Sequence, residues 1–248
     1  MDTTEALRRV KRILPMLIED VKTAIQSHAV METTNAIVPS ETKGLRSPFL
    51  ETYGAVQTAL ALKFAMDLAR LFDWSAGRKL KDQEKASVLV LSALLVRADV
   101  QAELEAAAIG CRSDVASLTG VTDAPLRSLA SKRQAVSRNA FRTPLTDFFA
   151  AVERLNADGS PAKAALKRLR DFRTKRLAHV LFDDKPDPWP TYGDLHLLLE
   201  IAIEAVTAAA LAIDGLNTSL DERAALDRAN AEGFARCLVE GLKGAVVP

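Results

Sequence analysis

The sequence contains little of what a β-sheet requires. Aromatic residues make up 5% of the 248 residues and there are only 11 glycines, whereas alanine, leucine, arginine, lysine and glutamate are abundant. The abundant residues favour helix, and too few aromatic and β-branched side chains remain to build a sheet. A chain of this length can bury a large core. We therefore expect one all-α domain that spans residues 1–248.

The chain is also poor in cysteine and has no long apolar run. Cys111 and Cys237 lie far apart without a CxxC spacing, so we expect two reduced, buried, small hydrophobic residues and neither a disulfide nor a metal pair. The first residues mix charges and lack the apolar core of a signal peptide. The apolar stretches 88–96 and 205–213 are shorter than the ~20 residues of a membrane span. These features predict a cytoplasmic protein with no membrane partner.

Capping residues and prolines divide the chain into helices and loops; Ser160 before Pro161, and Thr191 with Asp194 three positions on, are predicted to cap two of the helices. No repeat at a solenoid period is present, which favours a helical bundle. Loops are expected at 33–46, at a basic connector over 73–81, and at the proline-rich 183–190. The expected helices span 4–31 with a kink at Pro15, 47–74, 82–96, 98–109, 113–119, further helices that start at Asp123 and Thr143, 161–180, 191–216, and one that starts at Ser219 and ends near 241–244.

Charge is unevenly distributed, although the net charge is only +1. Residues 127–182 contain thirteen Lys and Arg against four Asp and Glu, a balance of +9. Residues 183–228 contain three against ten, a balance of −7. A basic stretch suits a polyanion such as RNA, because phosphate contacts supply most sequence-independent affinity. The alternative is that the two stretches pack against each other or dimerise head to tail.

The segment Arg173-Thr174-Lys175-Arg176-Leu177-Ala178-His179 contains one of only three histidines. An arginine neutralises charge on a phosphate, and an imidazole moves a proton near neutral pH, so this pairing suits RNA cleavage without a metal. On one ideal helix Arg173 and His179 point about 120° apart. They converge if the helix ends at His179, or if a second copy of the chain completes the site. The competing interpretation is an ordinary histidine at a helix end.

The spacing Arg-x5-His in FRTKRLAH, the proline-broken loop after it and the capped helix PTYGDLHLLLEIAIEAV resemble the HEPN superfamily, in particular its abortive-infection U-type (AbiU2-like) branch. The resemblance is strongest over 160–213, and LARLFDWSA at 68–76 is similar to the helices that precede the motif in that branch. It implies a HEPN-like antiparallel helical bundle, most evident over 160–216, with extra N-terminal helices. It also implies a homodimer and, in many members, a metal-independent ribonuclease of toxin or phage-defence systems, for which an antitoxin or nucleotidyltransferase partner is expected.

In that resemblance Arg173 and His179 match the catalytic pair. His179 would act as general base or acid at the ribose 2′-hydroxyl or the leaving 5′-oxygen, and Arg173 would stabilise the anionic phosphorus centre, giving 2′,3′-cyclic phosphate and 5′-hydroxyl ends. Thr174 stands where active members commonly have asparagine. Further RNA or phosphate contacts are expected from Arg170, Thr174, Lys175 and Arg176, with no cofactor and no metal.

Other groups carry weaker signals. His28 and His196 lack spaced ligand partners, which argues against zinc. The aspartates at 183, 184 and 187 suit a solvated turn better than a cation site. Trp189 is expected to pack, with base stacking as the alternative. The function alternatives are therefore an endoribonuclease or a non-catalytic HEPN-like module that binds RNA, nucleotide or a protein partner; a DNA-binding regulator is disfavoured because no compact helix-turn-helix is present.

Overall fold

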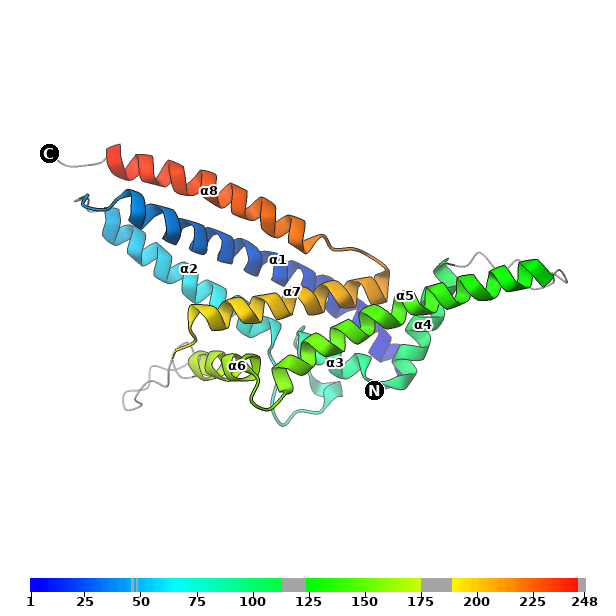
Figure 1. The fold of residues 1–248 in the computed structure, drawn as a ribbon. Coiled ribbons are helices and arrows are strands. Elements are labelled where there is room, and N and C mark those ends of the chain that lie inside the picture. Colours follow the sequence, from blue (N-terminus) through cyan, green and yellow to red (C-terminus); the bar gives the residue numbers. More distant parts are fainter. Residues whose placement is uncertain (46, 48, 113–123, 175–188, 245–248) are drawn as a thin grey trace. The chain divides into compact units, whose positions relative to one another are not determined.

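The computed structural model describes residues 1–45, 47, 49–112, 124–174 and 189–244. These residues form helices and connecting turns without a strand, which confirms the all-α prediction (Figure 1). The elements in chain order are α1 (Thr3–Glu41), α2 (Phe49–Leu71), the 3₁₀ turn η1 (Leu80–Asp82), α3 (Val88–Leu95), α4 (Ala98–Arg112), α5 (Ala124–Asn156), α6 (Pro161–Phe172), α7 (Tyr192–Asp214) and α8 (Leu220–Gly244).

The described residues group into two compact units, and α1, α6 and α7 each contribute to both. The first unit comprises Met1–Ile18, Leu71–Ala164 and Glu200–Thr218, and the second comprises Glu19–Arg70, Ala165–Leu199 and Ser219–Pro248. Domain organisation as a single body remains a prediction.

The core of the first unit is built around the short apolar helix α3. All of its large side chains except Leu89's are buried, because the helix packs on both α4 and α5. Ser87 caps it by accepting a hydrogen bond from the Val90 backbone N–H, 3.2 Å away. Glu105 of α4 ion-pairs with Arg138 and Arg142 of α5 and joins those two helices.

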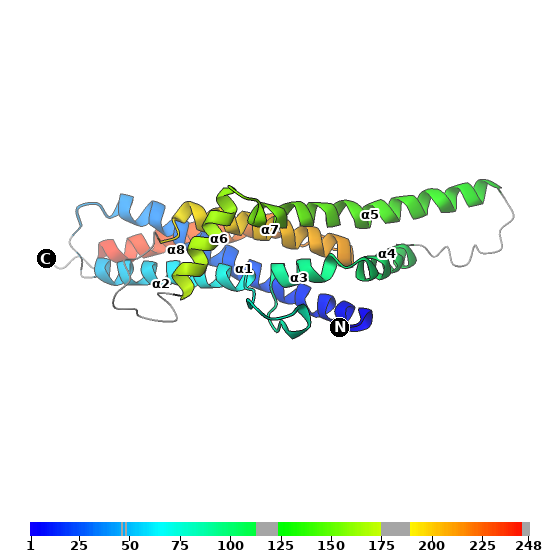
Figure 2. The ribbon, with the colours of Figure 1, turned by 90° about the horizontal axis from the view of Figure 1, so that it is seen from below.

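In the second unit α1, α2 and α8 lie side by side (Figures 1 and 2). Val38 of α1 packs with Val239 and Leu242 of α8, and Leu50 and Tyr53 of α2 cover this cluster. Apolar burial of this kind is the main favourable term in folding. It explains why α1 is longer than the sequence predicts.

The loop expected over 33–46 is wrong, because α1 continues to Glu41. Thr34 and Val38 are fully buried there. The hydroxyls of Thr34 and Thr42 donate to the carbonyls four residues earlier, which satisfies polar groups inside the helix. Tertiary packing therefore outweighs the weak local helix preference of this threonine-rich stretch.

The helix start expected at Thr143 is also wrong, because α5 runs through Pro144. Buried Phe141, Leu145, Phe148 and Val152 recur at helical spacing on both sides of the proline. That continuous apolar stripe stabilises one helix despite the missing N–H. The helix expected over 82–96 instead begins at Val88, and the expected 113–119 helix lies outside the described residues.

Within the part of the chain that the structure describes, α7 is long and apolar enough to cross a membrane by length and composition. Half of its most apolar stretch of 18 residues is buried inside the protein. Leu198, Ile201, Ala202, Ala205 and Val206 are among its core residues. These residues contribute to the core of the protein, and a cytoplasmic location stays a prediction.

Candidate functional site

The structure places Arg173 directly after α6, the basic helix that the sequence predicts to begin at Pro161. The Ser160 hydroxyl accepts from the Ala162 N–H at the start of this helix, as an N-cap does. Leu169 and Phe172 are buried on its inner face, while Arg170 is exposed. Arg173 is half-buried at the end of the helix, and Thr174 after it is exposed.

Arg173 and Thr174 form a π-helical turn, so α6 ends at Phe172, and the rest of the stretch that the sequence predicts to be helical, 175–180, lies outside the described residues. The separation of about 120° was calculated for an ideal α-helix, from which Arg173 and Thr174 depart. Such turns are rare and are often found at functional sites. Lys175, Arg176 and His179 lie outside the described residues, as do the aspartates at 183, 184 and 187, so the convergence of Arg173 and His179 stays a prediction.

An aromatic contact joins the two ends of the segment that carries the motif. Phe172 and Trp189 have ring centroids 4.9 Å apart and an interplanar angle of 51°. Phe172 is buried, whereas Trp189 is half-exposed. Trp189 therefore packs as expected, and its exposed surface leaves base stacking open as well. The contact brings the residues just before and just after 173–188 together.

The second flank is fixed by a capping box at the start of α7, which confirms the predicted role of Thr191. The Thr191 N–H donates to Asp194 Oδ2 at 2.8 Å, and the Asp194 N–H donates to Thr191 Oγ1 at 3.1 Å. Arg168 of α6 adds a two-pronged ion pair to the same carboxylate, with Nε 2.8 Å from Oδ2. These hydrogen bonds, above all that from Arg168, lower the pKa of Asp194. The Arg168–Asp194 pair ties α6 to α7 across the motif segment.

The ion pairs also bear on the two oppositely charged stretches. Arg168 pairs with Asp194, and Arg154 pairs with Glu204, so the basic stretch contacts the acidic stretch within each unit. Part of the positive charge of the basic stretch is therefore paired with carboxylates of the same protein. Sequence spacing gave no indication of these pairings, because the partners are 26 and 50 residues apart.

Two histidines that the sequence left unconnected meet in the second unit. The rings of His28 on α1 and His196 on α7 stack with centroids 5.1 Å apart, and Tyr192 and Phe64 also contact His28. His28 is 6% exposed, and its Nε2 is buried without a hydrogen-bond partner among the described residues. Burial lowers the pKa of His28 below 6.5, opposed by Glu32 and reinforced by His196 and Arg228. The arrangement holds a neutral imidazole in the core.

No group of three or more His, Cys, Asp or Glu side chains in the described ranges is arranged to hold a metal ion. Cys237 is free and exposed, so its expected burial is wrong. It lies on α8, whose inward-facing residues include Ala235 and Val239, and position 237 is turned away from that face. The side chain of Cys111 lies outside the described part of the structure.

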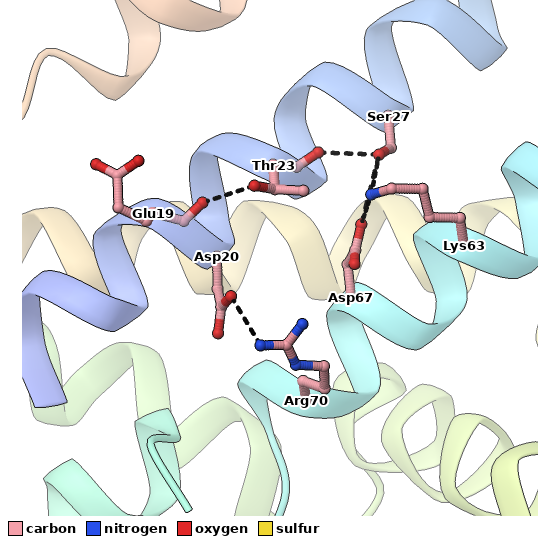
Figure 3. Close-up of polar contacts among 7 residues, drawn as sticks. All are labelled: Glu19, Asp20, Thr23, Ser27, Lys63, Asp67 and Arg70. Atoms are coloured by element: carbon pink, nitrogen blue, oxygen red, sulfur yellow. Dashed lines mark hydrogen bonds and ion pairs between the residues drawn. The ribbon is translucent and has the colours of Figure 1, made fainter.

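A polar network joins α1 to α2 in the second unit (Figure 3). Lys63 Nζ lies 2.5 Å from Asp67 Oδ2 and 3.0 Å from Ser27 Oγ, and Ser27 donates to the Thr23 carbonyl. A serine beside a lysine resembles a nucleophile with its base. Here Lys63 donates a hydrogen bond to Ser27 Oγ and also pairs with Asp67, and the Ser27 hydroxyl donates to a backbone carbonyl, so the network supports a structural role.

A separate ion pair between the same two helices has the same structural role. Arg70 of α2 donates to Asp20 of α1 at 3.2 Å (Figure 3). Burial raises the pKa of Asp20 above 3.8, and the Arg70 guanidinium opposes that rise. This pair thus matches the partly buried Asp20 carboxylate with a cation across the α1–α2 contact.

Comparison with known proteins identifies the family. No curated protein and no solved structure matches the chain. The family model HEPN_AbiU2, described as AbiU2, matches residues 9–234. The match includes α6, the Arg173 turn and the capped helix α7, and it reaches well into the N-terminal helices. The chain therefore belongs to the AbiU2 family of HEPN proteins.

Proposed function

We propose that this protein is a metal-independent endoribonuclease of a toxin or phage-defence system, with Arg173 and His179 forming its active site at a homodimer interface. The strongest support is the way in which the residues around the Arg-x5-His segment are held. A half-buried arginine stands on a π turn, and the residues on either side of 173–188 are held together by Phe172–Trp189 and by Arg168–Asp194. Membership of a HEPN family supports the same site.

The proposed chemistry uses the nucleophile of RNA itself. His179 takes the proton from the 2′-hydroxyl, and the 2′-oxygen attacks phosphorus while the bond to the 5′-oxygen breaks. The leaving 5′-oxygen is protonated by an imidazolium, from the same or the second copy, so that a 2′,3′-cyclic phosphate and a 5′-hydroxyl result. Arg173 binds the phosphate oxygens, whose negative charge is greatest in the transition state.

Growth of expressing cells and cleavage of purified RNA test the assignment together. His179→Ala and Arg173→Ala should each relieve growth inhibition and abolish cleavage at equal soluble protein. Arg173→Lys should recover little activity, because an ammonium lacks the planar fork of guanidinium. Arg236→Ala, an exposed arginine on α8, is the matched control and should behave as wild type. Equal toxicity and cleavage in the His179→Ala protein would reject the ribonuclease.

The metal requirement is tested separately. Cleavage should persist in excess chelator, should be absent on DNA of the same sequence, and should leave cyclic phosphate ends. Loss of cleavage in chelator with recovery on addition of magnesium would assign the chemistry to the aspartates at 183, 184 and 187 and would remove the proposed roles of Arg173 and His179.

The dimer is tested at Thr174, which is exposed. Light scattering should give twice the chain mass, and Thr174→Cys in a Cys237→Ser background should form a 174–174 disulfide that mass spectrometry identifies. A strict monomer at micromolar concentration, or a dimer without that cross-link, would contradict a composite site. RNA binding without cleavage in all variants would instead favour the non-catalytic HEPN module.

A further inference from the structure

The first unit contains a second basic feature, between the start of α1 and the connector that joins α2 to α3. A groove of about 410 Å³ lies there, lined by five cationic side chains, two carboxylates and four uncharged residues. The lining residues are Glu5, Arg8, Arg9, Arg12, Ile13, Met16, Lys81, Gln83, Glu84, Lys85 and Ala86. Both walls belong to the same compact unit.

The connector is fixed in place by one buried amide. Gln83 is wholly buried, and its side chain accepts from the Ser75 N–H at 3.0 Å and donates to the carbonyls of Ser75 and Arg78 at 2.9 and 3.1 Å. Gly77 makes the turn with φ of +78°, a conformation that other residues rarely adopt. The connector is therefore a shaped loop whose polar interior is satisfied.

Arg9 fastens this loop to α1. Its Nη1 donates to the carbonyls of Leu80 and Lys81 at 3.0 and 3.3 Å. Carbonyl oxygens satisfy the donors of a guanidinium without cancelling its charge, so the groove keeps a fixed positive charge at this point. The geometry is thus built before any ligand arrives, which lowers the ordering cost of binding.

In the described part of the chain, carboxylates pair with only some of the cationic side chains in the groove. Arg8 pairs with Glu5, and Lys85 pairs with Asp73. Arg12 and Lys81 are exposed and make no ion pair or hydrogen bond with the described residues through their side chains. Two cations that face one groove and lack carboxylate partners are suited to an anion from outside.

A second hollow extends the positive surface. It is lined by Gly77, Arg78, Lys79, Lys81, Asp82 and Glu84, and it shares Lys81 and Glu84 with the groove. The two hollows together present seven cations and three carboxylates along one continuous track. An extended ligand with several phosphates matches such a track better than a single phosphate does. The lining contains no aromatic side chain, so contact is with the backbone and not with stacked bases.

We propose that this track, which includes Arg12 and Lys81, binds the phosphodiester backbone of single-stranded RNA independently of base sequence. The choice of RNA over other polyanions rests on the proposed function. The track lies in the unit that does not contain Arg173, so RNA binding there and cleavage at Arg173 and His179 are separable properties.

Fluorescence anisotropy with labelled single-stranded RNA of mixed sequence tests the track, using the His179→Ala protein so that the probe stays intact. Removing two phosphate contacts in Arg12→Ala/Lys81→Ala should weaken binding about 25-fold at 0.1 M salt and reduce the slope of log K against log salt by about 1.4. Lys11→Ala/Lys43→Ala is the matched control, because both lysines are exposed, unpaired among the described residues and absent from the track. The control should bind as the parent does.

Three results would overturn the proposal: equal weakening in the control pair, unchanged binding in the track variant, or complete displacement of RNA by ATP at a concentration equal to that of the RNA phosphates. The first would show a general effect of net charge, and the last would identify a free nucleotide as the ligand. If binding depends on the track but the wild type does not cleave RNA, the track is supported and the ribonuclease is rejected. If the wild type cleaves RNA but binding does not depend on the track, the ribonuclease is supported and the track is rejected.

Discussion

Replacing Arg168 by alanine removes the guanidinium that holds Asp194 across the motif segment. The Arg168 side chain is 32% exposed and that of Asp194 only 10%, so the carboxylate is left nearly buried without its cation. Breaking a fully buried pair from one side costs about 3–5 kcal/mol. Solvent reaches Arg168, and Asp194 keeps the two capping hydrogen bonds with Thr191, so we expect a smaller loss of about 1–3 kcal/mol in the free energy of unfolding.

Urea unfolding followed by helical circular dichroism measures this loss. Arg154→Ala is the matched control, because the Arg154–Glu204 pair joins the same two charged stretches but its side chains are 42% and 53% exposed. An exposed pair contributes about 0–1 kcal/mol. A double-mutant cycle with Asp194→Ala separates the coupling of Arg168 to Asp194 from the loss of the cap.

Lowering the pH provides a second test, because the direction of the expected change in stability follows from the pKa of Asp194. The pKa of Asp194 is lower in the folded protein than its ordinary 3.8, mainly because Arg168 donates hydrogen bonds to the carboxylate. This stabilisation is therefore complete above about pH 4 and is lost as the pH falls through the folded pKa. The difference between wild type and Arg168→Ala should shrink in that range. A loss no larger than that of Arg154→Ala, or one independent of pH below 4, would refute the reasoning.

Three further predictions follow from single side chains. Because burial lowers the pKa of His28 below 6.5, the unfolded state binds protons first, so stability should fall as the pH drops below about 6.5, by at most about 1.4 kcal/mol per pH unit; His28→Gln should flatten that slope in urea titrations, and an unchanged slope would contradict a buried neutral imidazole. Gln83→Ala removes three hydrogen bonds that a wholly buried side chain makes to partly buried backbone groups, so we expect a loss of about 2–4 kcal/mol, measurable as a lower Tm, whereas a loss under 1 kcal/mol would show that Gln83 does not fix the connector. Cys237 should react fully with iodoacetamide in the native protein, as peptide mass mapping would show, and protection from the reagent would indicate that this face of α8 is covered in solution.

The sequence by itself determined the helix starts that depend on local chemistry. Ser160 and Thr191 cap α6 and α7 as predicted, because an N-cap is a hydrogen bond between residues two or three apart. Composition alone determined the all-α class. The Arg-x5-His spacing, with the loop and capped helix after it, also indicated the family that the match over 9–234 shows.

Only the tertiary structure decided the features that depend on partners far along the chain. α1 continues past residue 33 because Val38 is buried against Val239 and Leu242 of α8. Nothing in the sequence of 33–46 indicates that α8 packs there. The same holds for α5, which crosses Pro144 because a buried stripe continues on both sides of it.

The sequence offered the packing of the basic stretch against the acidic stretch as one interpretation, but the individual charged and aromatic pairs could not be predicted from it. Arg168 meets Asp194 and His28 meets His196 because helices from different parts of the chain pack in one unit. The basic connector was visible as composition, but its shape follows from the burial of Gln83 and from Arg9 on α1. Local hydrogen bonds can be read from neighbouring residues, whereas burial and pairing across the chain are fixed by the packing of whole helices.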